Sequence, residues 1–321
     1  MTVKFGVHIE PQLGYDYENA ELIALEAEKL GYDSFWASDH LFWDEQSENR
    51  NCMDAWTLLA ALAARTTKIR LGTLVTCNSY RHPPLLAKIA ATVDLISNGR
   101  LFFGFGAGWK EVEYNAYGYA FPPIGIRMDQ MEEAIQIIRL LWTEDKPSFE
   151  GEHYTIKDAF SAPKPVQKPT PPIMIGGDGE KRTLRAVAKY ADYCNLFPRP
   201  NLEHKLDVLK KHCEAVGRNY DEVGKSLFIM TYGVLVTESE EEKEAWFARV
   251  SEDFGKPIEE IKERQQDGWP GSWVGNPDEI IERFQHFIGM GFDYFQVMFP
   301  GYGEDYVDAS KAFSEKVMKK L

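Results

Sequence analysis

The sequence predicts a (β/α)8 barrel, and three observations lead to this fold class. Short β-rich runs alternate with helical patterns along all 321 residues, which is typical of a parallel sheet whose strands are joined by helices. The alternation yields eight strands, whereas an open doubly wound sheet normally has about five to seven. No internal repeat, low-complexity tract or linker interrupts the pattern, so we expect one domain over residues 1–321.

The first half of the chain supplies four of these strands. An apolar run at 3–9 precedes a helix at 19–30, where Ala20, Ile23 and Ala27 recur at helical spacing and Gly31 marks the end. The further strands expected are 34–37, 69–76 and 101–105, and the further helices are 54–65 and 84–96. Residues 106–127 are too rich in Gly, Tyr and Pro for a regular element, and an amphipathic helix starts after them at Met128.

The second half continues the same alternation after a long insertion. A small hairpin at 149–156 and a proline-rich stretch at 162–172 lead to the fifth strand at 173–175. The remaining strands are expected at 193–196, 227–236 and 292–299, and the helices at 183–190, 202–216, 278–289 and 305–320, with acidic helical patterns over 239–266. The barrel therefore carries insertions after its fourth strand and before its fifth, and its ligand site should lie at the carboxyl ends of the strands.

Composition and charge exclude several functional classes. The chain has 36 basic and 50 acidic residues and a formal charge of −14, which repels nucleic acids and anionic membranes. Cys52, Cys77, Cys194 and Cys213 form no CxxC pair, which predicts reduced thiols rather than disulfides or a zinc site. Neither a signal peptide nor a membrane span is evident, so we expect a cytoplasmic protein without a metal ion.

The second strand ends in Asp39 and His40, where barrel enzymes keep their catalytic groups. Histidine transfers protons near neutral pH, and a neighbouring carboxylate fixes its tautomer or holds a cofactor hydroxyl. The alternative is that Asp39 caps a turn and His40 makes only a local hydrogen bond.

The segment Gly176-Gly177-Asp178-Gly179 stands between the fifth strand and the following helix. Glycines allow several backbone N–H groups to converge, and the helix N-terminus adds the positive end of a dipole, so the loop favours a phosphate. Lys181 and Arg182 strengthen this interpretation. The alternative is an ordinary tight turn.

Two further segments follow strands. The run of residues 104–109, GFGAGW, resembles a dinucleotide fingerprint weakly, because Trp109 replaces its third glycine and the run ends the fourth strand. Its glycines either let a flat ring approach the backbone, with Trp109 as a stacking wall, or serve a loop that needs positive φ. Cys77 with His82 as nucleophile and base is a minor alternative, since nothing indicates that they face each other.

Taken together, these segments resemble the luciferase-like monooxygenase superfamily, and within it the branch of oxidoreductases that use coenzyme F420, an 8-hydroxy-5-deazaflavin. The likeness is carried by residues 27–40, 71–76 and 104–109. Shorter matches lie at 98–101, 122–127, 149–156 and 172–179, with weaker ones at 273–279 and 292–297. The resemblance covers about residues 3–200.

The resemblance implies a bacterial luciferase-like barrel that binds a deazaflavin, or alternatively FMN, and usually forms a homodimer. It implies that His40 acts beside the substrate, with Asp39 next to it, and that the peptide between Leu74 and Val75 is cis and backs the cofactor ring. The residues that it assigns to the cofactor are Asp39, Leu74, Val75, Cys77, Ala107, Gly108, Trp109, Gly176, Gly177, Asp178 and Gly179.

One departure narrows the expected reaction. The F420-dependent sugar-phosphate dehydrogenases of this group carry a catalytic glutamate directly after the glycine run, where this chain has Trp109. A less polar organic substrate is therefore expected, and Glu111 and Glu113 are candidates to replace the missing acid. We expect hydride transfer between coenzyme F420 and this substrate; the alternatives are a monooxygenase that uses reduced FMN and a non-catalytic flavin-binding barrel.

Overall fold

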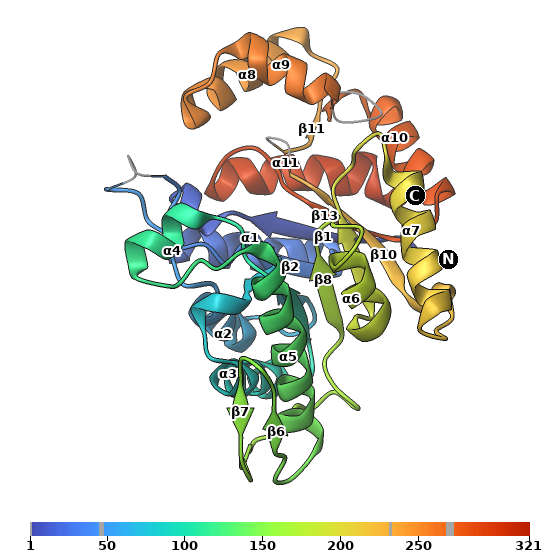
Figure 1. The fold of residues 1–321 in the computed structure, drawn as a ribbon. Helices are drawn as coiled ribbons and strands as arrows, with labels where there is room; N and C mark the ends of the chain where they lie inside the picture. Colours follow the sequence, from blue (N-terminus) through green and yellow to red (C-terminus); the bar gives the residue numbers. More distant parts are fainter. Residues whose placement is uncertain (1, 45–47, 231–232, 268–272) are drawn as a thin grey trace.

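A closed barrel of parallel strands forms the centre of the computed structural model, which describes residues 2–44, 48–230, 233–267 and 273–321 (Figure 1). Neighbouring strands pair in chain order, and Lys4 in the first strand lies opposite Tyr294 in the last, which closes the sheet. The predicted fold class is confirmed. The barrel strands are β1 (Lys4–Ile9), β2 (Ser34–Ala37), β3 (Arg70–Thr73), β5 (Leu101–Gly106), β8 (Ile173–Gly176), β9 (Tyr193–Leu196), β10 (Gly224–Ile229) and β13 (Tyr294–Val297).

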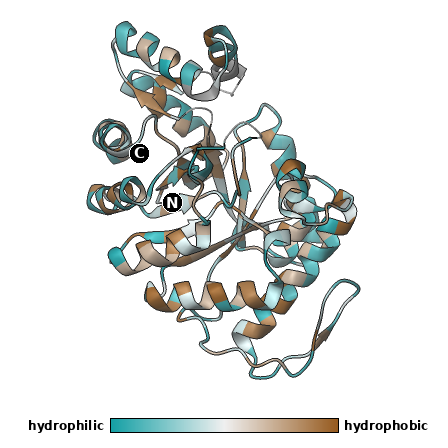
Figure 2. Cartoon of the chain, turned by 90° about the vertical axis from the view of Figure 1, so that its left-hand side faces the viewer, coloured by the Kyte–Doolittle hydropathy of each residue, from teal (hydrophilic) through white to brown (hydrophobic). Residues whose placement is uncertain are grey.

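Helices surround the barrel, and Figure 2 shows hydrophobic and hydrophilic residues alternating along them, as expected of helices with one face on the sheet. Side chains fix several helix starts: Asp16 accepts the N–H of Asn19 at 2.8 Å, and Asn276 with Glu279 forms a capping box. These helices are α1 (Tyr17–Leu30), α2 (Ala55–Arg65), α3 (Pro83–Ile96), α5 (Ile124–Thr143), α6 (Thr183–Tyr190), α7 (Leu202–Ala215), α10 (Pro277–Gly289) and α11 (Gly303–Lys316).

The segment after the fourth barrel strand is more regular than predicted. Residues 106–127 contain the short helix α4 (Glu111–Tyr117) and the start of α5 at Ile124. The helix forms despite its Gly- and Tyr-rich surroundings because Glu113 and Tyr114 are fully buried and anchor it. The predicted hairpin is confirmed as the antiparallel pair β6 (Phe149–Glu150) and β7 (Thr155–Ile156).

A second insertion stands between β10 and β13, and the predicted strand 227–236 is wrong there. Strand β10 ends at Ile229, and β11 (Leu235–Val236) pairs instead with β12 (Val274–Gly275) in a separate sheet; residues 231–232 lie outside the described chain. The acidic helical region forms α8 (Glu240–Phe254) and α9 (Ile258–Asp267), which lie apart from the other helices at the top of Figure 1. They have a small core of their own around Trp246, Phe247 and Ile261.

Large side chains fill the inside of the barrel, which leaves the carboxyl ends of the strands as the expected place of a ligand site. Trp36, Phe102 and Tyr294 pack together inside the sheet. On neighbouring strands Asn195 donates to Ser226 Oγ at 2.9 Å and to Gln296 Oε1 at 2.8 Å. In the part of the chain that the structure describes, no helix is long and apolar enough to cross a membrane, and no three ligating side chains gather in a metal-like cluster.

Candidate active site

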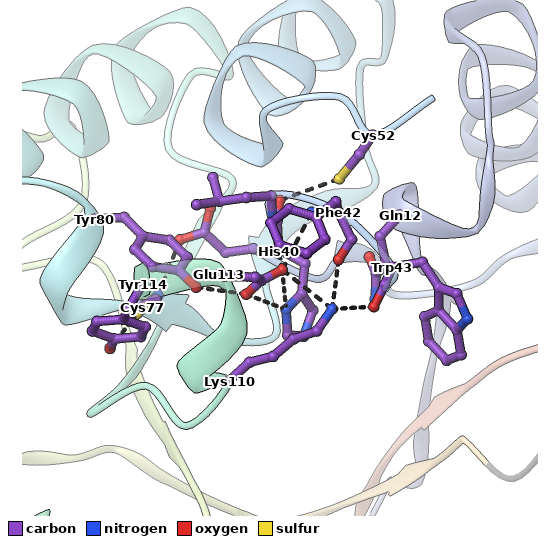
Figure 3. A network of polar contacts seen from close by, with 12 residues as sticks. Gln12, His40, Phe42, Trp43, Cys52, Cys77, Tyr80, Lys110, Glu113 and Tyr114 are labelled. Atoms are coloured by element: carbon purple, nitrogen blue, oxygen red, sulfur yellow. Dashed lines mark hydrogen bonds and ion pairs between the residues drawn. The ribbon is translucent and has the colours of Figure 1, made fainter. Parts of the chain in front are cut away.

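His40, which is partly exposed, and Glu113, which is buried, form a pair at the carboxyl end of β2 (Figure 3). The Nδ1 of His40 lies 3.1 and 3.0 Å from the two carboxylate oxygens of Glu113. Glu113 comes from the first turn of α4, 73 residues later in the chain. Because Nδ1 is engaged, the ring nitrogen left to exchange a proton is Nε2. Glu111, the other candidate, is exposed on the same turn.

Glu113 remains charged although its side chain is completely buried. Its carboxylate also accepts the N–H of Leu41 at 2.8 Å and the hydroxyl of Tyr80 at 2.6 Å. Burial works to raise the pKa of Glu113, but the hydrogen bond and charge of His40, together with Tyr80 and Leu41, outweigh it and lower the pKa to about 2. A fixed negative charge therefore stands behind the imidazole.

Lys110 ties the loop after His40 to the start of α4. Its ammonium donates to the carbonyls of Phe42 and Trp43 and lies 3.4 Å from Glu113 Oε1. Trp109 precedes it and meets the His40 ring edge-on, with ring centroids 5.7 Å apart. The indole is 71% exposed, so most of its surface faces outward at the mouth of the site.

Asp39 is buried and paired with Arg81. The guanidinium of Arg81 donates to both carboxylate oxygens at 2.8 and 3.0 Å and also reaches Asp54. The backbone N–H of Cys77 donates to Asp39 Oδ2 at 3.0 Å. Burial keeps the pKa of Asp39 above its ordinary value, with Arg81 working against this shift. Asp39 thus joins the end of β2 to the segment after β3.

Strand β3 is interrupted where the resemblance placed a special peptide. The Leu74–Val75 bond is cis, and β4 (Thr76–Cys77) resumes pairing beyond it. The Val75 side chain lies against two glycines of neighbouring strands: an added Cβ would stand 2.8 Å from it at Gly106 and 3.1 Å at Gly176. The glycines at the ends of β5 and β8 leave the space that Val75 occupies.

Cys77 is a packed thiol rather than a nucleophile paired with His82. Its Sγ lies 3.1 Å from the Tyr114 hydroxyl, whereas His82 is exposed and contacts the ring of Tyr154. Burial raises the pKa of Cys77 to about 11, which disfavours the thiolate. Gly108 lies against the same pair, since its added Cβ would fall 2.6 Å from Cys77 Sγ. The Ala107 carbonyl lies 3.4 Å from the Tyr114 hydroxyl.

The glycine loop 176–179 leads from β8 to the start of α6 at Thr183. Gly177 has φ +125°, and its N–H is used by the Asn195 carbonyl at 3.1 Å. Within the described chain no protein acceptor meets the backbone N–H groups of residues 179–182. Asp178 lies 3.5 Å from Arg199. Arg182 does not strengthen a phosphate site as expected, because it turns to Asp129 and Glu132 on α5.

A second buried polar group lies at the end of β1. The Nε2 of His8 is 3.1 Å from Glu10 Oε1 and 3.2 Å from Ser38 Oγ, and Gln12 donates to the other Glu10 oxygen. Burial raises the pKa of Glu10, but His8 and the charge of His40 outweigh it, so the pKa lies below its ordinary value. The hydroxyl of Tyr306 in α11 donates to the His8 carbonyl at 2.7 Å.

The comparison with protein families now decides the relationship of this chain. A family model described as luciferase-like monooxygenase matches residues 2–294. The chain belongs to this family. The resemblance found in the sequence is thereby confirmed.

A curated relative and two solved structures are similar to this chain over nearly its full length. An F420-dependent glucose-6-phosphate dehydrogenase from Amycolatopsis mediterranei is 28% identical over 319 residues, which cover 93% of this chain and 92% of the relative. An F420-dependent secondary alcohol dehydrogenase, solved with an F420–acetone adduct, superposes with a TM-score of 0.82 at 22% identity, covering 99% of both chains. A type II Baeyer–Villiger monooxygenase from Pseudomonas putida with FMN superposes with a TM-score of 0.75 at 17% identity, covering 100% of this chain and 99% of that one.

For this luciferase-like barrel, the sequence missed several polar residues of the site. Glu10 ends a strand and was available by the rule that carboxyl ends of barrel strands carry function. Tyr80 and Arg81 lie in a polar segment where the sequence suggested only Cys77 and His82 as candidate residues. Lys110 gave no signal, because its contacts are with backbone carbonyls.

Proposed function

We propose that this protein is an F420-dependent oxidoreductase that transfers a hydride between the cofactor and an organic substrate of low polarity. The observation that carries the proposal is the His40–Glu113 pair, because it leaves one imidazole nitrogen for proton exchange at the strand ends. The F420-dependent relatives support the choice of cofactor.

One imidazole can accept and return the single proton that such a reaction transfers. Bound coenzyme F420 supplies a ring carbon that accepts or returns a hydride. For an alcohol, the C–H bond breaks as hydride leaves, the O–H bond breaks, and its proton passes to His40 Nε2 while the carbonyl forms. In the reverse direction, Nε2–H returns the proton to the carbonyl oxygen. A histidine performs both roles near neutral pH.

The strand ends fit a cofactor with a flat ring and a phosphate. We assign the ring to Asp39, Cys77, Ala107, Gly108 and Trp109, backed by Leu74 and Val75, and the phosphate to the loop Gly176, Gly177, Asp178 and Gly179. The unused N–H groups of residues 179–182 at the start of α6 support the phosphate position. Lys181 is exposed beside them and adds a positive charge.

The residue after the glycine run supports a substrate of low polarity. Trp109 stands where the sugar-phosphate enzymes of the group have an acid, and it is 71% exposed beside the His40 ring. An exposed indole at this place favours an apolar or aromatic alcohol or carbonyl compound over a sugar phosphate.

Cofactor titration tests the proposal directly. We expect F420 to bind more tightly than FMN when fluorescence is followed during titration of the purified protein, and absorbance of F420 to change with secondary alcohols of increasing apolar size. Tight FMN binding without any response to F420 would replace the proposal by a reduced-flavin monooxygenase. Binding without turnover of any substrate class would favour a non-catalytic barrel.

The phosphate loop has its own test in Gly177→Val. Gly177 has φ +125° and an added Cβ would lie 3.3 Å from Thr183 Cγ2, so valine strains the loop and narrows it. We expect cofactor affinity to fall at least tenfold. Gly217→Val is the matched control, because Gly217 also has positive φ, 70°, but an added Cβ meets nothing within 4 Å. Equal losses in both variants would remove the phosphate assignment.

We also propose a cytoplasmic homodimer that pairs through α3. Leu85, Leu95 and Ile96 are 56%, 51% and 43% exposed on this helix, an apolar surface that a second copy would cover. The four cysteines are free thiols, as expected in a reducing compartment. Sedimentation velocity tests the assembly: Leu85→Glu should yield monomers, whereas the parent sediments as a dimer. A monomeric parent protein would contradict this.

A further inference from the structure

We propose that Glu113 is the positioning residue that sets the tautomer of His40. The sugar-phosphate enzymes of the group carry an acid at the place of Trp109, and in this chain Glu113 supplies the acidic group from a different position. The predicted effect on kcat rests on the proposed function, whereas the predicted tautomer of His40 rests on the geometry alone. Glu113 touches neither substrate nor cofactor in this assignment. It acts through the imidazole.

The hydrogen bond between His40 and Glu113 has a fixed direction. A buried carboxylate accepts and does not donate, so the Nδ1 of His40, 3.0 Å away, carries the hydrogen. Neutral His40 is then protonated at Nδ1 and bare at Nε2. Nε2 is consequently ready to receive a proton in every turn of the reaction, and the ring does not need to rotate.

Glu113 itself is held in place by several donors. Its oxygens accept the N–H groups of Leu41 and Phe42 at 2.8 and 3.3 Å and the Tyr80 hydroxyl at 2.6 Å. Leu41 and Phe42 directly follow His40, so the carboxylate holds both the ring and the backbone that carries it. Such a site keeps the imidazole in one orientation before substrate arrives.

Several other titratable groups surround the pair. Those that face Glu113 or His40 are Tyr80, Lys110, Cys52, Cys77 and, directly after β1, Glu10. Of these, Lys110 lies 3.4 Å from Glu113 and the others do not bond to the His40 ring. Glu111 is exposed and has no part in the network. One carboxylate therefore determines the protonation site of the ring.

The experiment compares the parent protein with Glu113→Gln, and with Glu111→Gln as the matched control on the same helical turn. The imidazole 15N shifts of His40, assigned from their loss in His40→Ala, report the tautomer without any cofactor. We expect the Nδ1–H form in the parent and in Glu111→Gln. In Glu113→Gln the amide oxygen takes the Oε1 place and accepts the Leu41 and Phe42 N–H groups, so the NH2 group takes the Oε2 place and faces Nδ1. An NH2 group donates to a bare Nδ1, so the preference for Nδ1–H should fall.

Kinetics add a second readout. In Glu113→Gln we expect kcat to fall about 10²-fold or more, KM to change little, and the pH at which half of the activity is reached to move to lower pH. Where the glutamine variant does not fold, Glu113→Asp replaces it, because the shorter side chain withdraws the carboxylate from Nδ1 while keeping its charge. An unchanged tautomer in the folded variant overturns the inference. A parent protein without F420 turnover but with the expected tautomer shift overturns only the proposed function.

Discussion

His40 differs from other histidines of the chain in what its two ring nitrogens meet. His8 is fully buried, with Nε2 bonded to Glu10 and Ser38 and Nδ1 without a partner in the described chain. His82 is exposed at the start of α3. Among these three histidines, His40 alone has Nδ1 bonded to a carboxylate and a ring that is partly exposed. Its side chain is 18% accessible. This combination suits proton exchange with a substrate.

We expect His40→Ala to lower turnover by roughly 10²–10⁴-fold, the range of general acid–base catalysis, while cofactor affinity changes less than threefold. The measurement is steady-state kinetics together with a fluorescence titration of cofactor. His82→Ala is the control, since this exposed histidine follows the end of the neighbouring strand and should leave both quantities unchanged. Unchanged turnover in His40→Ala would make His40 a structural residue.

The sequence predicted the site residues that directly follow a strand, and it did not identify the residues that reach the site from other segments. Asp39 and His40 directly follow β2, so their position was sufficient. Glu113 was only one of two candidates, because 73 residues separate it from His40 and helix α4 was not foreseen. The pairing of Arg81 with Asp39 depends on how the interrupted third strand turns, which spacing alone does not reveal.

At the element scale, Glu28 connects the end of α1 to the loop before β3. Its carboxylate accepts the backbone N–H groups of Thr67, Lys68 and Ile69 at 2.8, 2.6 and 2.9 Å. Partial burial works to raise the pKa of Glu28, but these three donors and the Thr67 hydroxyl outweigh it and lower the pKa to about 2. One side chain thus satisfies a loop whose N–H groups would otherwise lack partners.

We expect Glu28→Gln to lower the free energy of unfolding by about 1.5–3 kcal/mol at pH 7, because charge-assisted hydrogen bonds are lost. The folded pKa lies below the ordinary 4.5, so the contribution is complete above about pH 4.5 and disappears as the pH falls toward 2. Urea unfolding of both proteins at several pH values measures the difference. Glu26→Gln, which loses only a surface pair with Lys29, should change stability by under about 1 kcal/mol. A gap between parent and Glu28→Gln that is independent of pH would refute the assignment.

Several barrel elements were predictable because their local patterns are characteristic: buried strands are short apolar runs, and helices on the sheet have one apolar face. Strands 34–37 and 193–196 and helix 183–190 match the structure residue for residue. The region 106–127 and the break of 227–236 into β10 and β11 were not predicted. Tertiary contacts determine the structure in both regions. Tyr114, within the short helix α4, is fully buried. Strand β11 pairs with β12 about 40 residues later, which local periodicity does not encode.

At the scale of the whole molecule, the barrel interior is packed around Trp36, and Gly72 leaves the space that its indole occupies. Trp36 fills the interior, and Gly72 on the neighbouring strand lies opposite it in register. An added Cβ at Gly72 would stand 2.5 Å from the indole and 3.0 Å from the Phe102 carbonyl. The eight-strand alternation predicted the barrel, whereas this complementarity inside it appears only in the folded chain.

Gly72→Ala should therefore destabilise the protein by about 1–3 kcal/mol through overpacking. Differential scanning calorimetry would record a lower Tm. Gly125→Ala is the matched control, because an added Cβ there meets nothing within 4 Å and alanine favours the helix; its Tm should stay equal or rise. Equal Tm values for Gly72→Ala and the parent would mean that Trp36 relaxes without cost.

The bond from Tyr306 to the His8 carbonyl joins residues 298 positions apart. During synthesis, the first strand with His8 and Glu10 leaves the ribosome long before α11 is made. The His8 carbonyl therefore gains its hydrogen bond from Tyr306 only after α11 has been added. The first and last barrel strands likewise meet only after residues 294–297 have been made. A chain cut short before β13 would contain every residue proposed to handle protons and cofactor and would still lack the strand that closes the sheet, so enzymatic turnover in a cell would report only molecules in which β13 has been made.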